Sequence, residues 1–191
     1  MTQISATTLY LVRHGEVHNP EGIIYGRLPG FGLSERGRRQ IARAAEALGS
    51  HGPFAALYAS PLQREQESAA ILSARFDLAV ATEEQIVETN IGSFQGRHLK
   101  DLPRLYITEK GAHPELESAA LMRGRLLDWA ATIRARHPGE RIIAVSHRDP
   151  IIVALLYWMG AGLEQLPDFA LETGAVYAVE LGDANRIALL A

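Results

Sequence analysis

The chain of 191 residues contains no cysteine, so it can form neither disulfides nor a cysteine metal site, and it lacks a thiol nucleophile. The absence of cysteine suits a reducing compartment, and we expect a cytoplasmic protein. Aromatic residues are scarce at 7%, whereas the hydrophobic fraction of 47% and the charged fraction of 21% are ordinary for a soluble globular chain. At this length we expect one domain over residues 1–191.

The sequence also lacks a long hydrophobic run and an excess of positive charge. The longest apolar stretch, residues 151–162, is too short to span a bilayer and predicts a buried helix. Residues 1–8 are polar, unlike a signal peptide. The formal net charge is −3, which argues against a general nucleic-acid or membrane binder. Any recognition of an anion must therefore depend on a local group of arginines.

Short apolar strands alternate with helices along the chain, which predicts an α/β layered fold with a largely parallel sheet. We expect strands at 9–12, 54–59, 78–82 and 141–145, and helices at 35–48, 61–76, 115–136 and 150–159, with a short helix around 99–106. Residues 175–181 and 186–190 should form a hairpin. The expected N-caps are Ser34, Ser60, Ser118 and Asp149, with Pro61 and Pro150 in first helical positions.

Polar residues follow three of these strands at the point where each strand ends. They are Arg13 and His14, residues 60–64, and Ser146 and His147. Because the carboxyl ends of parallel strands meet at one edge of a sheet, we expect these side chains to converge there. Arg64 lies in the first turn of a helix, where a cation is unfavourable, so we expect an anion beside it. The set suits a dianionic phosphoryl group, although the glycine-rich loop of nucleotide hydrolases is missing.

Four segments, in order, carry a resemblance to a known family. They are Leu11-Val12-Arg13-His14-Gly15-Glu16, residues 60–69, Ile86-Val87-Glu88 with Gly92 and Gly96, and Val145-Ser146-His147. The chain resembles the histidine phosphatase superfamily, the phosphoglycerate-mutase-like proteins, from Leu9 to about Met159. The resemblance implies a three-layer α/β/α fold with a mostly parallel central sheet.

The resemblance also implies a metal-independent phosphatase that hydrolyses a small phosphorylated metabolite and needs no cofactor. His14 would be the nucleophile, forming a phosphohistidine. Arg13, Arg64 and His147 would bind the phosphoryl oxygens. Glu88 would protonate the leaving group and then activate water.

Two positions depart from the family pattern. Relatives carry asparagine where this chain has Pro20, so Asn19 is the candidate phosphate ligand if the loop is one residue shorter. Relatives carry glycine where this chain has Arg148, which either reaches a second acidic group of the substrate or points into solvent. Tyr25, Arg27 and Arg97 are candidates to line the substrate pocket, and solvated loop positions are an equal alternative for them.

Three other functions stay open. A mutase would return the phosphoryl group to a second hydroxyl of the substrate, although the short interval between Glu88 and His147 favours an open site and hydrolysis. A phospholigand-binding module without turnover is a second alternative, and a metallohydrolase is a third. His18, four residues after His14, suits a metal pair only on a helix, which Gly15 and Pro20 disfavour. The chain could also form a homo-oligomer.

Overall fold

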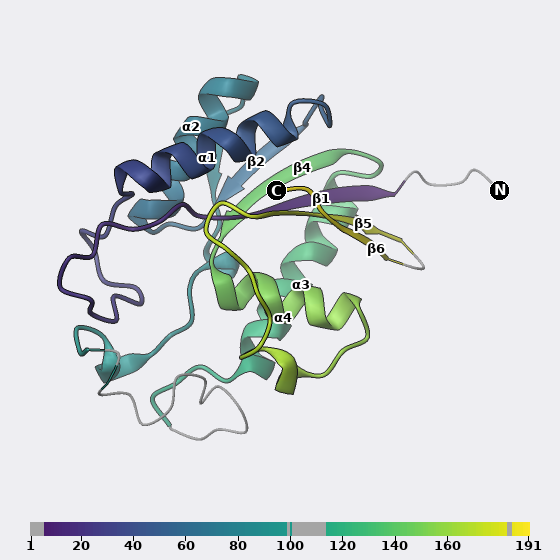
Figure 1. Ribbon diagram of the computed structural model, residues 1–191. Coiled ribbons are helices and arrows are strands. Elements are labelled where there is room, and N and C mark those ends of the chain that lie inside the picture. Colours follow the sequence, from purple (N-terminus) through teal and green to yellow (C-terminus); the bar gives the residue numbers. More distant parts are fainter. Residues whose placement is uncertain (1–5, 99, 101–113, 183–184) are drawn as a thin grey trace.

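The computed structural model describes residues 6–98, 100, 114–182 and 185–191 and is built on one mixed sheet. The strand order is β3-β2-β4-β1-β5-β6 (Figure 1). β3, β2, β4 and β1 pair with their neighbours in parallel, whereas β5 pairs antiparallel with both β1 and β6. The strands are β1 (Thr7–Arg13), β2 (Ala56–Ala59), β3 (Val80–Thr82), β4 (Arg141–Ser146), β5 (Val176–Leu181) and β6 (Arg186–Leu189).

Helices cover both faces of the sheet, as Figure 1 shows. α1 (Glu35–Leu48) and α2 (Gln63–Phe76) lie on one face, and α3 (Ala119–Arg136) and α4 (Arg148–Trp158) lie on the other. Three short 3-10 helices complete the described elements: η1 (Glu84–Ile86), η2 (Gly92–Phe94) and η4 (Leu163–Gln165). The predicted three-layer α/β/α fold with a mostly parallel sheet is confirmed. No helix among the described residues is both long and apolar enough to cross a membrane.

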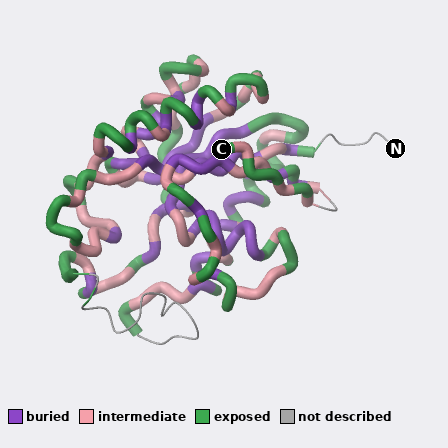
Figure 2. Tube along the Cα trace, viewed as in Figure 1, coloured by how far each residue is buried: buried purple, intermediate pink, exposed green. Residues whose placement is uncertain are grey.

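The sheet separates two hydrophobic clusters because successive side chains of a strand point to opposite faces. Leu9 and Leu11 of β1 face α3 and α4, whereas Tyr10 and Val12 face α1 and α2. Burial is accordingly concentrated along the central strands and α4 (Figure 2). Trp129 is fully buried in the α3–α4 cluster, as its apolar helix face predicts.

Two helix starts differ from prediction, and both differences involve the predicted site. The proposed caps Ser60 and Asp149 are wrong. α2 begins at Gln63 with Leu62 as N-cap, because the Ser60 hydroxyl is engaged with His147 instead. α4 begins at Arg148 directly after His147, and Asp149 lies in its first turn, bonded to Arg148.

Other boundaries move by a few residues. α3 starts at Ala119, with Ser118 capping it as predicted, and Ser34 caps α1 through a 3.0 Å bond from the Gly37 amide. The expected hairpin is present as β5 and β6. The short helix expected around 99–106 falls almost entirely outside the described residues.

Two glycines allow α1 to approach the chain just after β1. A Cβ atom on Gly37 would lie 2.1 Å from the Glu16 carbonyl oxygen, and one on Gly15 would lie 2.4 Å from the Gly37 oxygen. Both obstacles are backbone atoms, which cannot rotate away. Gly15 is therefore required by the packing of α1, next to the residue pair Arg13 and His14.

We expect Gly37→Ala to destabilise the protein by about 1–3 kcal/mol, because the methyl group forces α1 away from the backbone of Glu16, just after β1. Urea unfolding measures the change. Gly124→Ala is the matched control, since its Cβ would meet nothing within 4 Å on α3, and it should stabilise the helix by about 0.5–1 kcal/mol. Equal stability changes in the two variants would contradict this close approach.

Candidate active site

The carboxyl ends of β1, β2 and β4 meet at one edge of the sheet, as predicted. Arg13 pairs with Ser146 in the β1–β4 register, and Ala59 of β2 pairs with Val145 of β4. His14 and His147 therefore leave adjacent strands at the same level, and their ring centroids are 5.5 Å apart. The loops of residues 18–32 and 84–98 gather at this edge, on the left of Figure 1.

His14 is a buried, neutral imidazole with one free nitrogen. Its Nδ1 lies 2.7 Å from the Gly15 carbonyl oxygen, which can only accept, so Nδ1 carries the proton. Burial lowers the pKa of His14 well below its usual value, and the positive charges of Arg64 and Arg13 lower it further. The unprotonated Nε2 is consequently available as a nucleophile near neutral pH.

His147 is held from both sides. Its Nδ1 accepts a 2.9 Å hydrogen bond from Nη2 of Arg64, so Nε2 carries the proton of the neutral ring and donates to the Ser60 hydroxyl at 2.8 Å. Burial, followed by the charge of Arg64, lowers the pKa of His147 well below its usual value. Ser60, expected as a helix cap, therefore orients a predicted catalytic residue.

Arg64 is fully buried in the centre of the site. Its Nη2 donates to the Gly26 carbonyl at 3.0 Å, and its guanidinium lies 4.8 Å from the centroid of the Tyr25 ring. Acidic groups are present where an anion was expected, since Arg64 contacts Oε1 of Glu65 at 3.1 Å and Oε2 of Glu88 at 3.8 Å. Burial disfavours negative charge on both, so the cation in the unfavourable first turn of α2 is only partly offset.

Two arginine N–H groups in this site have no acceptor in hydrogen-bond geometry among the described residues. Arg13 donates from Nη1 to the Leu171 carbonyl, but its Nε, like Nε of Arg64, is buried without a hydrogen-bond partner among the described residues. A buried unsatisfied donor costs about 1–3 kcal/mol. The site therefore presents N–H groups to which an anionic ligand could bind.

Glu88 reaches the site from the chain after η1. Its Oε2 lies 3.5 Å from Nδ1 of His147, and its Oε1 accepts a 2.8 Å bond from the Thr89 amide. Burial raises the pKa of Glu88, and the negative charge of Asp149 raises it further. A carboxyl group with a raised pKa is suited to donate a proton.

Arg27 binds the backbone of Glu88. Its Nε donates to the Glu88 carbonyl oxygen at 2.7 Å, and its Nη2 pairs with Glu117 at 3.2 Å. Arg125 of α3 also bonds Glu117, at 2.7 Å. The predicted substrate-lining residue is thus engaged in holding the backbone of the acid segment.

The remaining predicted ligands are engaged in local contacts. Both ends of the Asn19 amide bond the backbone of Ile23. The Arg148 guanidinium bonds Asp149 and the carbonyl oxygen of Phe169, at 2.8 Å each, so the expectation that it points into solvent is not met. Tyr25 lies against Arg64, within the site. Substrate contacts of Asn19, Arg148, Tyr25, Arg27 and Arg97 stay predictions.

The sequence reasoning missed Glu65, which is fully buried beside both histidines. Its Oε1 lies 2.8 Å from Nδ1 of His147 and 3.6 Å from Nε2 of His14. Burial raises the pKa of Glu65 well above its usual value. The sequence could have indicated Glu65, because it directly follows Arg64 in a helix turn that was expected at the site.

A metal ion fits this cluster poorly. Potential ligand atoms of His14, Glu65 and His147 lie within 4.8 Å of one another. However, nitrogens of the Arg64 guanidinium lie 2.9 Å and 3.1 Å from two of these atoms. A cation here would meet a fixed positive charge, whereas an anion would be attracted to it.

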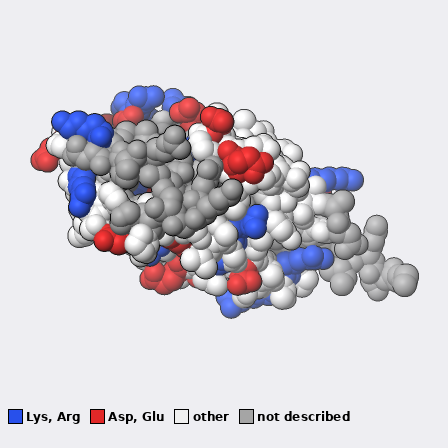
Figure 3. Space-filling model, turned by 90° about the horizontal axis from the view of Figure 1, so that it is seen from below, with Lys and Arg blue, Asp and Glu red and all other residues white. Residues whose placement is uncertain are grey.

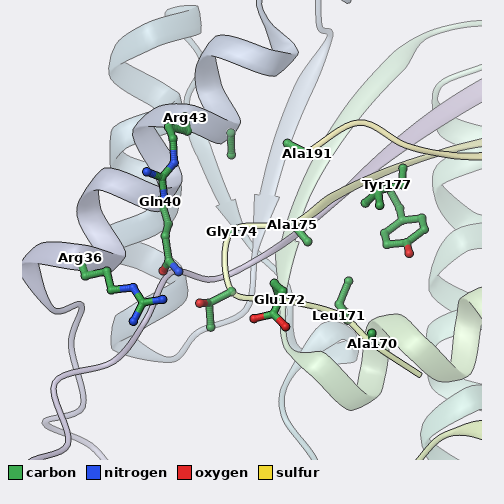
Figure 4. Close-up of a pocket in the computed structure, with 13 residues that line it drawn as sticks. Arg36, Gln40, Arg43, Ala170, Leu171, Glu172, Gly174, Ala175, Tyr177 and Ala191 are labelled. Carbon is green, nitrogen blue, oxygen red and sulfur yellow. The ribbon is translucent and has the colours of Figure 1, made fainter. Parts of the chain in front are cut away.

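The positive charge of the site is local. On the face shown in Figure 3, acidic and basic side chains are interspersed over the described residues. A separate groove of about 460 Å³ lies between α1, which contributes Arg36, Gln40 and Arg43, and the segment before β5, which contributes Glu172 (Figure 4). Gly174 lines this groove, and its amide donates to the carbonyl oxygens of Arg13 and His14, so the groove adjoins the backbone of the candidate site.

Comparison with known proteins agrees with this geometry. The chain is 40% identical over 170 residues to an uncharacterized protein of Mycobacterium tuberculosis, covering 82% of this chain and 81% of that one. It is 31% identical over 153 residues to the metal-independent phosphoserine phosphatase of Arabidopsis thaliana, covering 74% of this chain and 64% of that one. The structure of Bacillus stearothermophilus YhfR superposes with a TM-score of 0.85 at 24% identity, over 96% of each chain.

The family comparison covers nearly the whole chain. Residues 9–190 match the model of the histidine phosphatase superfamily (branch 1), beyond the segment from Leu9 to about Met159 that carries the resemblance in sequence. The match includes β5 and most of the chain after it, and β5 extends the sheet by pairing with β1. The chain belongs to the histidine phosphatase superfamily.

Proposed function

We propose that the protein is a metal-independent phosphatase that hydrolyses a small phosphomonoester through a phosphohistidine on His14. The observation that carries this proposal is a pair of buried N–H groups, Nε of Arg13 and Nε of Arg64, that lack an acceptor in hydrogen-bond geometry among the described residues, in the same site as the unprotonated Nε2 of His14. A phosphoryl group supplies several acceptor oxygens and an electrophilic phosphorus at once. A binding module would need the donors but not the free nucleophile.

In the first step, Nε2 of His14 attacks phosphorus in line with the leaving oxygen, forming an N–P bond as the P–O ester bond breaks. Arg13 and Arg64 bind the non-bridging oxygens and stabilise the charge that other phosphoryl-transfer enzymes balance with a metal. His147, whose Nε2 is held by Ser60, binds a third oxygen through Nδ1, which must take up a proton to donate because it accepts from Arg64 without the substrate. Because His14 is already neutral, no base has to remove a proton from it before attack.

Glu88 serves both half-reactions as the acid and the base. Protonated, it gives its proton to the leaving alkoxide, and as a carboxylate it then takes a proton from the water that attacks the phosphohistidine. The second step releases inorganic phosphate and restores both His14 and Glu88. The raised pKa of Glu88 favours the protonated form required at the start.

The proposed substrate is a small phosphorylated metabolite. The relative from Arabidopsis is named as a phosphoserine phosphatase that is independent of metal, which supports a small phosphomonoester and a metal-free reaction. The same residues would serve a mutase, so the product identifies the reaction: inorganic phosphate for hydrolysis, an isomeric phosphomonoester for transfer. We place the enzyme in the cytoplasm.

We expect His14→Ala to reduce phosphatase activity by about 10⁴-fold or more in a screen of phosphorylated metabolites, because the nucleophile is lost. Acid-labile, alkali-stable phosphoryl label should appear on the wild-type protein and be missing from the variant. His51→Ala is the control, since His51 lies before β2, contacts Tyr10 and belongs to the opposite edge of the sheet. Normal turnover in His14→Ala would contradict the assignment.

Activity should be unchanged after extended dialysis against EDTA, because Arg13 and Arg64 supply the positive charge. The measurement compares kcat/KM before and after dialysis, and again after Mg²⁺ or Zn²⁺ is added back. Loss of activity in EDTA that a metal restores would support a metallohydrolase instead.

The rate should be highest on the acid side of neutral. As the pH rises through the raised pKa of Glu88, the protonated fraction falls about tenfold for each pH unit, and kcat/KM falls with it. Glu88→Gln should lower turnover of alkyl phosphates by about 10²–10⁴-fold. The loss should be smaller with p-nitrophenyl phosphate, whose leaving group needs no proton. A profile that keeps rising well above pH 8 would exclude Glu88 as the acid.

A further inference from the structure

We propose that the carboxyl group of Glu65 is an additional ligand of the phosphoryl group, binding it as a neutral acid and competing with it as a carboxylate. This inference rests on the proposed function. It adds a proton to the binding equilibrium and assigns a role to a buried side chain that the reaction steps above do not use.

Glu65 contacts the same groups that a phosphoryl group would. A single oxygen, Oε1, lies 2.8 Å from Nδ1 of His147, 3.1 Å from Nε of Arg64 and 3.6 Å from Nε2 of His14. Nε of Arg64 is a proposed phosphoryl donor, His147 is a proposed phosphoryl ligand, and Nε2 of His14 is the nucleophile. Oε1 therefore occupies a position that a non-bridging phosphoryl oxygen requires, and an incoming phosphoryl group must share it or displace it.

The hydrogen-bonding capacity of Glu65 is unused in the free protein. Within the described part of the chain, both of its oxygens are buried and neither has a partner in hydrogen-bond geometry. The same is true of Nε of Arg64, the atom that faces it. A carboxylic acid, an arginine donor and a phosphoryl oxygen would satisfy one another, because the acid O–H and the arginine N–H can both donate to the phosphoryl group.

The charges around Glu65 decide its protonation. The groups that face it are Arg13 and His14 from the end of β1, Arg64 from α2, Glu88 from the chain after η1, His147 before α4, and Tyr25 from the loop of residues 18–32. Burial and the negative charge of Glu88 favour the neutral acid, whereas Arg64 and Arg13 favour the carboxylate. A bound dianion adds two negative charges beside Glu65, so binding should hold a proton there.

Proton uptake fixes the direction of the pH effect. The bound state retains the Glu65 proton to a higher pH than the free state, so affinity for a dianion should fall as the pH rises through the pKa of the free protein. With one proton coupled to binding, the dissociation constant rises about tenfold for each pH unit in that range. A neutral glutamine at the same position can donate a hydrogen bond but cannot become an anion.

The experiment measures binding of inorganic sulfate, whose charge is constant between pH 5.5 and 8.5, by titration calorimetry of the wild type and Glu65→Gln. We expect similar affinities at the lowest pH. Above the pKa of Glu65, the ratio of the wild-type dissociation constant for sulfate to that of Glu65→Gln should rise about tenfold for each pH unit. Calorimetry in two buffers of different ionisation enthalpy, at a pH above the pKa of Glu65, should show about one proton more taken up per sulfate by the wild type than by Glu65→Gln, which separates Glu65 from the other titratable groups of the site.

Glu67→Gln is the matched control on the same helix. Glu67 bonds Gln63, Arg38 and the Leu33 amide, away from the histidines, so this variant should keep the wild-type pH dependence. Any of three results would overturn the role of Glu65. The first is the same pH dependence of sulfate binding in Glu65→Gln and the wild type. The others are no greater proton uptake by the wild type than by Glu65→Gln, or loss of sulfate binding at every pH by a folded Glu65→Gln. If the wild type bound neither sulfate nor inorganic phosphate at any pH, the proposed function itself would fail.

Discussion

The parallel pairing of β4 with both β1 and β2 is the constraint on which the site depends. It brings three chain segments, separated by long stretches of sequence, to the same edge of the sheet. Because these strands are buried on both faces, polar side chains are tolerated only where the strands end. His14, Ser60 and His147 each directly follow the last residue of β1, β2 and β4. The hydrogen-bonded register of the three strands sets the distances between them.

Burying so many ionisable groups together has a clear electrostatic outcome. Desolvation disfavours charge on His14, His147, Glu65 and Glu88, so the pKa values of the histidines fall and those of the carboxyl groups rise. The arginines stay charged because guanidinium is too basic to lose its proton. The site thus combines fixed positive charge with neutral partners, an arrangement suited to the anionic ligand proposed above.

Much of this arrangement could be predicted from the sequence. Apolar runs of strand length, followed at once by polar residues, indicated β1, β2 and β4 and the edge where they meet. Helix starts at the site were predicted less well, because the propensity of Ser60 for an N-cap was overridden by its bond to His147. Arg27 and Arg148 illustrate the same limit: an arginine side chain has several possible acceptors, and here each donates a hydrogen bond to a backbone carbonyl oxygen.

The sequence by itself determined the layered fold, the edge of the sheet that carries the site and the segments that meet there, because hydrophobic periodicity and strand ends are local properties. Only the tertiary structure decided which nitrogen of His14 is free, how Ser60 orients His147, and that Glu65 lies against both histidines. Those facts depend on distances between side chains from different strands and on how completely water is excluded. Neither quantity is encoded in any single segment.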